Sequence, residues 1–137
     1  MDRILIDTGP LVALFNAGDA MHGAADAWFA GCHAQLHTVM PVLTEVGFFL
    51  PARQRAALAD LVAGGALQVH HPDAAGYKRI AALLRKYTDL DADWADACLV
   101  WAAEATGIHR IATLDVRDFS VYRIQGRTRF MMEALAP

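Results

Sequence analysis

The stretch RILIDTGPLVALF, residues 3–15, predicts how the fold begins. Residues 3–8 are a short apolar run rich in isoleucine, and Gly9-Pro10 ends it, which is typical of a buried strand turning into a helix. Pro10 suits the first turn of that helix, because the amide hydrogen that proline lacks has no partner there anyway. Asp7 is therefore expected at the carboxyl end of a buried strand, where a charge needs a structural or chemical reason.

The rest of the chain continues this alternation of strands and helices. Apolar or alternating runs predict strands, and Ala- and Leu-rich segments with helical spacing predict helices, most of them ten or more residues long. Strands that alternate with long helices favour a parallel sheet covered on both faces. The pattern predicts one α/β domain over residues 1–137. The predicted strands are 3–8, 35–40, 66–71, 109–114 and 120–124, and the predicted helices are 10–16, 22–32, 41–50, 53–63, 74–87 and 92–107.

Composition and charge favour a soluble cytoplasmic protein. Cys32 and Cys98 stand in Ala-rich segments without paired spacing, and no secretory leader precedes them. No segment approaches the roughly 20 uncharged apolar residues of a spanning helix. The net charge of −3 argues against a surface built mainly to bind phosphate. Residues 107–137 nevertheless carry five arginines against three acids, so a nucleic acid would be met by this end of the chain and by bound cations.

The triplet Asp7-Thr8-Gly9 could be the active-site turn of an aspartic protease. Such an enzyme needs two of these turns, so that two carboxylates share a proton, and this chain would have to form a homodimer. The segment YRIQGRT, residues 122–128, offers the Gly-Arg that a small protease of this type carries near its end. These proteases are almost entirely strands, however, and the middle of this chain has helical periodicity. The protease is therefore kept only as a remote alternative.

Five carboxylates are candidates for one site. Asp7 lies at the carboxyl end of one predicted strand, Asp115 follows another, and Asp118 comes shortly after. Glu45 and Asp96 are embedded in apolar helical sequence. Carboxyl ends of parallel strands meet at one edge of a sheet, which is where α/β proteins bind ligands. Buried carboxylates that converge repel one another, and a hard divalent cation such as Mg²⁺ or Mn²⁺ keeps them ionised together. A water on such a cation becomes a better nucleophile towards a phosphodiester.

Each acid also has a purely local interpretation. Asp7 could bond its own backbone in a turn, and Asp115 and Asp118 could be ordinary loop acids. Asp93 fits a helix N-cap, and Asp96 could be an acid favoured in the first turn by the helix dipole. It is the combination and order of the acids that indicates a site.

Four blocks of the sequence resemble PIN-domain ribonucleases and, within them, the VapC toxins of prokaryotic toxin–antitoxin pairs. The resemblance covers nearly the whole chain, and the order and spacing of the blocks are more distinctive than any one block. Trp94 departs from the family pattern, where a smaller aliphatic residue is more usual. The blocks are ILIDTGPLVALF (4–15), LTEV (43–46), DADWADACLVWAAEATG (91–107) and RIATLDVRDFSVYR (110–123).

This resemblance implies a three-layer α/β/α, Rossmann-like domain with a central, mainly parallel sheet of about five strands. It implies an endoribonuclease that binds Mg²⁺ or Mn²⁺ and hydrolyses RNA with metal-activated water. It also implies a protein antitoxin that covers the helices and blocks the site, and a homodimer is expected. The implied catalytic residues are Asp7, Glu45, Asp96 and Asp115. The implied metal ligands are Asp7, Asp96 and Asp115, with Glu45 and Asp118 acting through water. The implied supporting residues are Thr8 and Thr113.

The remaining candidates are weaker. Arg117, close to Asp115 in the sequence, could contact RNA phosphate. The six histidines lack chelating spacing and are expected to be structural or superficial. Trp28-Phe29 and GFFL (47–50) are expected in the core, and exposure of either would suit a homodimer or an antitoxin segment. A second function is also possible from these residues, namely a non-catalytic module that binds RNA or protein.

Overall fold

The computed structural model describes residues 2–135, and the α/β fold class is confirmed. Met1 and residues 136–137 of the predicted domain lie outside the described residues. The strands are β1 (Arg3–Ile6), β2 (Gln35–Val39), β3 (Leu67–His70), β4 (Arg110–Ala112), β5 (Arg123–Ile124), β6 (Thr128–Arg129) and β7 (Met131–Glu133). The helices are α1 (Thr8–Phe15), α2 (His22–Gly31), α3 (Met40–Phe48), α4 (Ala52–Ala63), α5 (Ala74–Lys86), α6 (Trp94–Thr106) and α7 (Val116–Val121), with a 3₁₀ turn at Thr88–Leu90.

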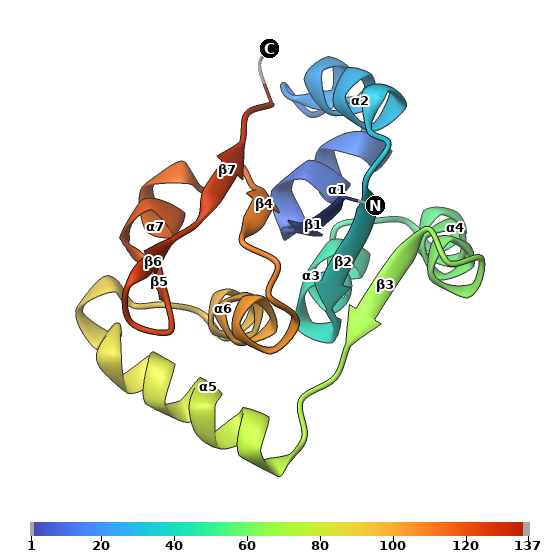
Figure 1. The fold of residues 1–137 in the computed structure, drawn as a ribbon. Helices are drawn as coiled ribbons and strands as arrows, with labels where there is room; N and C mark the ends of the chain where they lie inside the picture. Colours follow the sequence, from blue (N-terminus) through green and yellow to red (C-terminus); the bar gives the residue numbers. More distant parts are fainter. Residues whose placement is uncertain (1, 136–137) are drawn as a thin grey trace.

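The central sheet is parallel throughout. Its five strands run in the order β3-β2-β1-β4-β7. Figure 1 shows α5 and α6 on one side of this sheet and α1 with α2 on the other. Such a three-layer arrangement follows from the long crossover that each parallel pair of strands requires.

Strand β1 occupies the middle of the sheet. Ile4, Leu5 and Ile6 are all buried, because β2 and β4 pair with β1 on either side and helices cover both faces. Burial on both faces explains why the strand is a continuous apolar run and does not alternate. The chain leaves this strand at Asp7, which therefore lies at the carboxyl edge of the sheet.

The predicted strand at 120–124 is wrong for its first half. Residues 120–121 end α7, and only Arg123–Ile124 form a strand, β5. This strand pairs antiparallel with β6 in a separate two-stranded sheet, and the fifth strand of the central sheet is β7. The physical reason is that Phe119 and Tyr122 are both buried, three residues apart, which is the spacing of a helical turn and not of a strand.

Strand β7 lies in the C-terminal stretch, for which the sequence predicted no strand or helix. Met131 and Met132 pair in parallel register with Arg110 and Ile111 of β4. The described part of this stretch therefore completes the edge of the central sheet.

The expected burial of GFFL is wrong for its two phenylalanines. Leu50 is buried, whereas Phe48 is 85% exposed and Phe49 is 63% exposed. Helix α3 ends at Phe48, so the chain turns there and only Leu50 points back into the core. Trp28 and Phe29 are half-buried and pack against the core, and their two rings lie edge-to-face with each other.

The other predicted elements are present with ends shifted by a few residues. The largest change is in the predicted strand 109–114, of which only Arg110–Ala112 are in β4. Thr113 and Asp115 consequently lie beyond the strand, in the connection to α7.

No helix within residues 2–135 is both long and apolar enough to cross a bilayer.

Candidate active site

Asp7 is held rigidly where β1 meets α1. It is 7% exposed and caps α1, with its Oδ1 accepting a hydrogen bond from the backbone N–H of Thr8 at 2.8 Å. Its Oδ2 accepts from the hydroxyl of Thr113 at 2.8 Å, and its own N–H donates to the carbonyl of Ala112 at 3.0 Å. These bonds tie the end of β1 to the end of β4. The carboxylate is thus both a helix cap and a fixed group at the sheet edge.

Asp96 comes to the same edge from the first turn of α6. Asp93 is the N-cap, as expected, and its side chain accepts from the N–H of Asp96 at 2.7 Å. Asp96 itself is only 6% exposed, and its Oδ2 accepts from the hydroxyl of Tyr122 at 2.8 Å. A solvated first-turn acid would not be buried in this way, so the local interpretation of Asp96 is insufficient.

Asp115 and Asp118 complete an acidic cluster with Asp96. Asp115 caps α7, and its Oδ1 accepts from the N–H of Asp118 at 3.3 Å. One carboxylate oxygen from each of Asp96, Asp115 and Asp118 lies within 4.8 Å of the others. Among the described residues, this trio has a spacing that could hold a metal ion. Asp118, which by its sequence could be an ordinary loop acid, therefore lies in a cluster with Asp96 and Asp115.

Asp7 and Glu45 lie beside this trio and are connected to it through threonines. Thr113 donates to Asp7 and accepts from the N–H of Asp115 at 2.9 Å, so one hydroxyl joins the two acids. The hydroxyl of Thr8 donates to Oε2 of Glu45, from the half-buried face of α3, at 2.8 Å. Each of the two threonine hydroxyls thus donates to one of the predicted acids. The five acids come from the end of β1, from α3, from α6, from the β4–α7 connection and from α7.

Burial and mutual repulsion disfavour the charged forms of these acids. Removal from water raises the pKa of Asp7 from 3.8 to about 6, and the nearby charges of Asp93 and Asp115 add to the effect. Burial likewise raises the pKa of Asp96, although the hydrogen bond from Tyr122 opposes the rise. The pKa of Asp118 is raised by burial and by Asp115, while Arg117 lowers it. A divalent cation fits this donor set, because hard oxygen ligands that repel one another are stabilised by a central positive charge.

The protein without metal is expected to lose the stabilisation from Asp7 as pH rises. Its raised pKa means that the folded state binds this proton more tightly than the unfolded chain, so the contribution is full below about pH 4 and is lost through about pH 6. A shift of roughly two units corresponds to about 3 kcal/mol. Urea unfolding of the unaltered protein and of Asp7→Asn, both in EDTA from pH 4.5 to pH 8, measures the difference.

The variant isolates Asp7 from groups such as His37, whose pKa is lowered by burial and whose effect on stability has the opposite sign. Between pH 4.5 and pH 8, the free energy of unfolding of Asp7→Asn should rise relative to that of the unaltered protein by up to about 3 kcal/mol. A difference that stays constant with pH would contradict the assignment of a raised pKa to Asp7.

Two polar contacts could not be predicted from the sequence, one at the acidic site and one between β2 and β3. Tyr122 lies in the block 110–123, but the predicted strand there gave no reason to direct its hydroxyl at Asp96. His37 and His70 stack on neighbouring strands, with Nδ1 of His37 at 2.8 Å from Nε2 of His70. Their contact follows the register of β2 and β3, which spacing alone does not reveal. Arg117 is exposed next to the acidic cluster, so it remains available to a ligand.

The aspartic protease alternative fails on this architecture. Asp7 caps a helix after a parallel strand, and long helices such as α4, α5 and α6 make up the middle of the described chain. The all-strand fold that two paired Asp-Thr-Gly turns require is therefore not that of this protein.

Comparison with known proteins gives concordant matches. The PIN domain family matches residues 4–124. The chain is 32% identical over 132 residues to Ribonuclease VapC26 of Mycobacterium tuberculosis (strain ATCC 25618 / H37Rv), which covers 93% of this chain and 97% of that protein. The crystal structure of M. tuberculosis VapC20, a toxin that cleaves the sarcin-ricin loop, matches with a TM-score of 0.76 at 26% identity, covering 83% of this chain and 91% of the other. A toxin–antitoxin complex from Klebsiella pneumoniae shares the fold, with a TM-score of 0.68 at 18% identity over 97% and 98% of the two chains.

The matched region contains the site. Residues 4–124 include all five acids and both threonines, and they reach Tyr122. The resemblance seen in the four sequence blocks is confirmed, both for PIN-domain ribonucleases and for VapC toxins. With the family match, the relative of similar length and the shared fold in agreement, the chain belongs to the PIN domain family.

Proposed function

We propose that this chain is a single-domain, metal-dependent endoribonuclease and the toxin component of a VapBC-type pair. The observation that carries the proposal is the cluster of Asp96, Asp115 and Asp118, whose oxygens lie within 4.8 Å of one another at the carboxyl edge of a parallel sheet. The relatives support it, because VapC26 is named a ribonuclease and VapC20 a toxin that cleaves the sarcin-ricin loop. Mg²⁺ and Mn²⁺ are the proposed ions, since both prefer oxygen ligands.

The acids are proposed to bind the ion in different ways, some directly and some through water. Asp7, Asp96 and Asp115 are proposed as direct ligands, and Asp118, whose carboxylate lies with those of Asp96 and Asp115, is proposed to act through water. Glu45, fixed by Thr8, is proposed to act through water, and Thr113 keeps Asp7 and Asp115 in position. A divalent cation bound there would stabilise charge on a phosphodiester and lower the pKa of a coordinated water. The carboxylates of the free site repel one another, and a bound cation would relieve this repulsion.

RNA must approach this acidic edge through local positive charge. Arg117 is exposed and close enough to Asp118 to lower its pKa, so it is the proposed phosphate contact. Because the net charge is −3, electrostatic attraction between the protein alone and RNA is expected to be weak. The bound cation is expected to supply further attraction to the phosphates.

The proposed partners are an antitoxin and a second copy of the chain. An apolar hollow between α3, α4 and β3, lined by Met40, Leu43, Leu58 and Val69, could accept an apolar segment of an antitoxin. Phe48 and Phe49 project from the end of α3 with their rings edge-to-face at 5.5 Å. Two exposed aromatic side chains of this kind are typical of an interface. The cytoplasmic location stays part of the proposal, supported by two cysteines that are both free.

The homodimer proposal predicts that Phe48→Asp yields a monomer. An aspartate at a side chain that is 85% exposed should leave the fold intact but place a charge in the interface, where it costs several kcal/mol. Sedimentation velocity at tens of micromolar measures the change. Tyr77→Asp, also at an exposed aromatic but on α5, is the matched control and should remain dimeric. The dimer proposal would be refuted if the unaltered protein sedimented as a monomer.

The nuclease proposal is tested by incubating the purified protein with a mixed RNA pool in Mn²⁺ or Mg²⁺. EDTA should abolish cleavage, and added Mn²⁺ should restore it. An identically purified Asp7→Asn preparation controls for contaminating ribonuclease and should be strongly impaired. Cleavage that survives EDTA, or that equals the variant's, would refute the metal-dependent mechanism. Retention of RNA without any cleavage would instead favour the non-catalytic binding module.

A further inference from the structure

Tyr122 is a buried side chain whose only polar atom points at a site acid. The residue is 1% exposed, and its hydroxyl donates to Oδ2 of Asp96 at 2.8 Å. Its ring is wedged between two others, edge-to-face against Tyr87 at 5.0 Å and against Phe119 at 5.1 Å. A ring enclosed on two sides in this way has little freedom to turn. The position of its hydroxyl is therefore fixed by packing.

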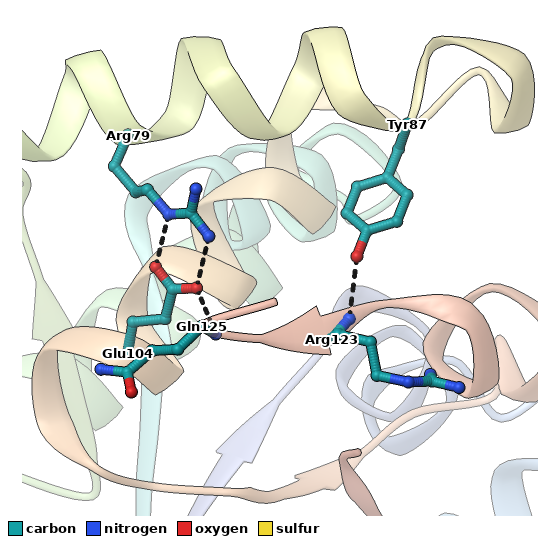
Figure 2. A network of polar contacts seen from close by, with 5 residues as sticks. All are labelled: Arg79, Tyr87, Glu104, Arg123 and Gln125. Carbon is teal, nitrogen blue, oxygen red and sulfur yellow. Dashed lines mark hydrogen bonds and ion pairs between the residues drawn. The ribbon is translucent and has the colours of Figure 1, made fainter. Parts of the chain in front are cut away.

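The backbone after Tyr122 is also anchored, by the polar network of Figure 2. The N–H of Arg123 donates to the hydroxyl of Tyr87 at 2.9 Å, and the N–H of Gln125 donates to Oε2 of Glu104 at 2.6 Å. Arg79 in turn holds that carboxylate with two hydrogen bonds of 2.7 and 2.9 Å. Helices α5 and α6 thus clamp the segment that carries Tyr122. None of these anchors uses a site acid.

The hydrogen bond joins this clamp to the acidic cluster. Asp96 belongs to the trio of aspartates whose carboxylate oxygens lie within 4.8 Å of one another. Its carboxylate can rotate about the side-chain bond unless another group holds it. A hydroxyl that donates to one of its oxygens fixes the carboxylate plane and leaves the remaining lone pairs for a cation. Partners of metal-ligating carboxylates commonly act in this way, and their loss costs about 10- to 100-fold in metal affinity or activity.

We propose that Tyr122 is a positioning residue that orients the carboxylate of Asp96 towards a bound divalent cation. The inference rests on the proposed function, since it takes Asp96 as a ligand. Tyr122 does not touch RNA or the reacting atoms in this role. A hydroxyl that merely satisfied a buried polar group would contribute to stability alone and would leave metal binding unchanged.

Tyr122→Phe separates the two roles, because it keeps the ring and removes only the hydroxyl. Calorimetric titration with Mn²⁺ alone, without RNA, should show about 10-fold weaker binding or more. In the cleavage reaction the Mn²⁺ concentration for half-maximal rate should rise by a similar factor, while KM for RNA stays within about twofold. Far-UV circular dichroism verifies the fold of the variant.

Tyr87→Phe is the matched control, because it deletes a second hydroxyl from the same aromatic cluster. That hydroxyl accepts from Arg123 and does not bond Asp96, so its loss should lower stability in urea and weaken Mn²⁺ binding clearly less than Tyr122→Phe does. Equal Mn²⁺ affinity for Tyr122→Phe and the unaltered protein would overturn the inference, as would equal losses in both variants. An unaltered protein that fails to bind Mn²⁺ would overturn the proposed function as well, which distinguishes the two failures.

Discussion

Asp96→Asn is expected to slow RNA cleavage at least about 10³-fold while leaving the fold intact. Asparagine has nearly the same shape as aspartate, but it removes the negative charge that a cation needs. Loss of several kcal/mol of charge stabilisation in the transition state corresponds to this factor. Single-turnover cleavage in saturating Mn²⁺ is the appropriate measurement, because it reports the chemical step and not product release.

The same variant should be at least as stable as the unaltered protein when metal is absent. Asp96 is 6% exposed, and its burial beside Asp7 and Asp115 raises its pKa, so a neutral side chain there relieves a cost. Lost activity combined with retained or increased stability in urea is the signature of a ligand and not of a structural residue. Asp73→Asn is the control, since Asp73 caps α5 through the N–H of Gly76 and asparagine caps equally well. Cleavage by Asp96→Asn within tenfold of the unaltered rate would refute the assignment of Asp96.

Thr113→Val is expected to damage stability and activity together. Thr113 is buried, and its hydroxyl both donates to Asp7 and accepts from the N–H of Asp115. Valine has the same shape but satisfies neither group, and each buried polar group without a partner costs about 1–3 kcal/mol. We expect a loss of about 3 kcal/mol in the free energy of unfolding and a 10- to 100-fold slower cleavage, because two site acids lose their common support.

Thr38→Val provides a matched control in strand β2. Thr38 is also fully buried, and its hydroxyl donates to the carbonyl of Ile6 at 2.8 Å without contacting an acid. That variant should lose about 1 kcal/mol of stability and keep its cleavage rate within about twofold. If both valine variants lost activity in proportion to their stability, Thr113 would have no special relation to the site.

The acids show which parts of the site can be predicted from the sequence and which cannot. The embedded charges at Asp7, Glu45 and Asp96 are visible because apolar neighbours make a solvated carboxylate improbable. Asp118 carries no such signal, since its neighbours are those of an ordinary loop. Its approach to Asp96 depends on where α7 begins and how α7 packs, and these are decided by contacts with residues distant in the chain.

The errors in the fold have a related cause. Residues 120–124 contain β-branched and aromatic residues, which favour a strand locally, yet burial of Phe119 and Tyr122 at helical spacing prevails. Strand β7 was not assigned because three residues pairing at a sheet edge leave almost no periodic pattern. The exposure of Phe48 and Phe49 depends on where α3 ends, and composition does not encode that position.

The sequence by itself determined the alternation of strands and helices, the single α/β class, and the order of acids that marks the PIN domain family. These follow from periodicities of two and 3.6 residues and from the cost of placing charge in apolar sequence, which are local properties. Only the tertiary structure decided that Thr113 bonds Asp7 across 106 residues, or that Tyr122 bonds Asp96 across 26. Such contacts arise when strands take their register and helices pack on the sheet, so no local pattern contains them.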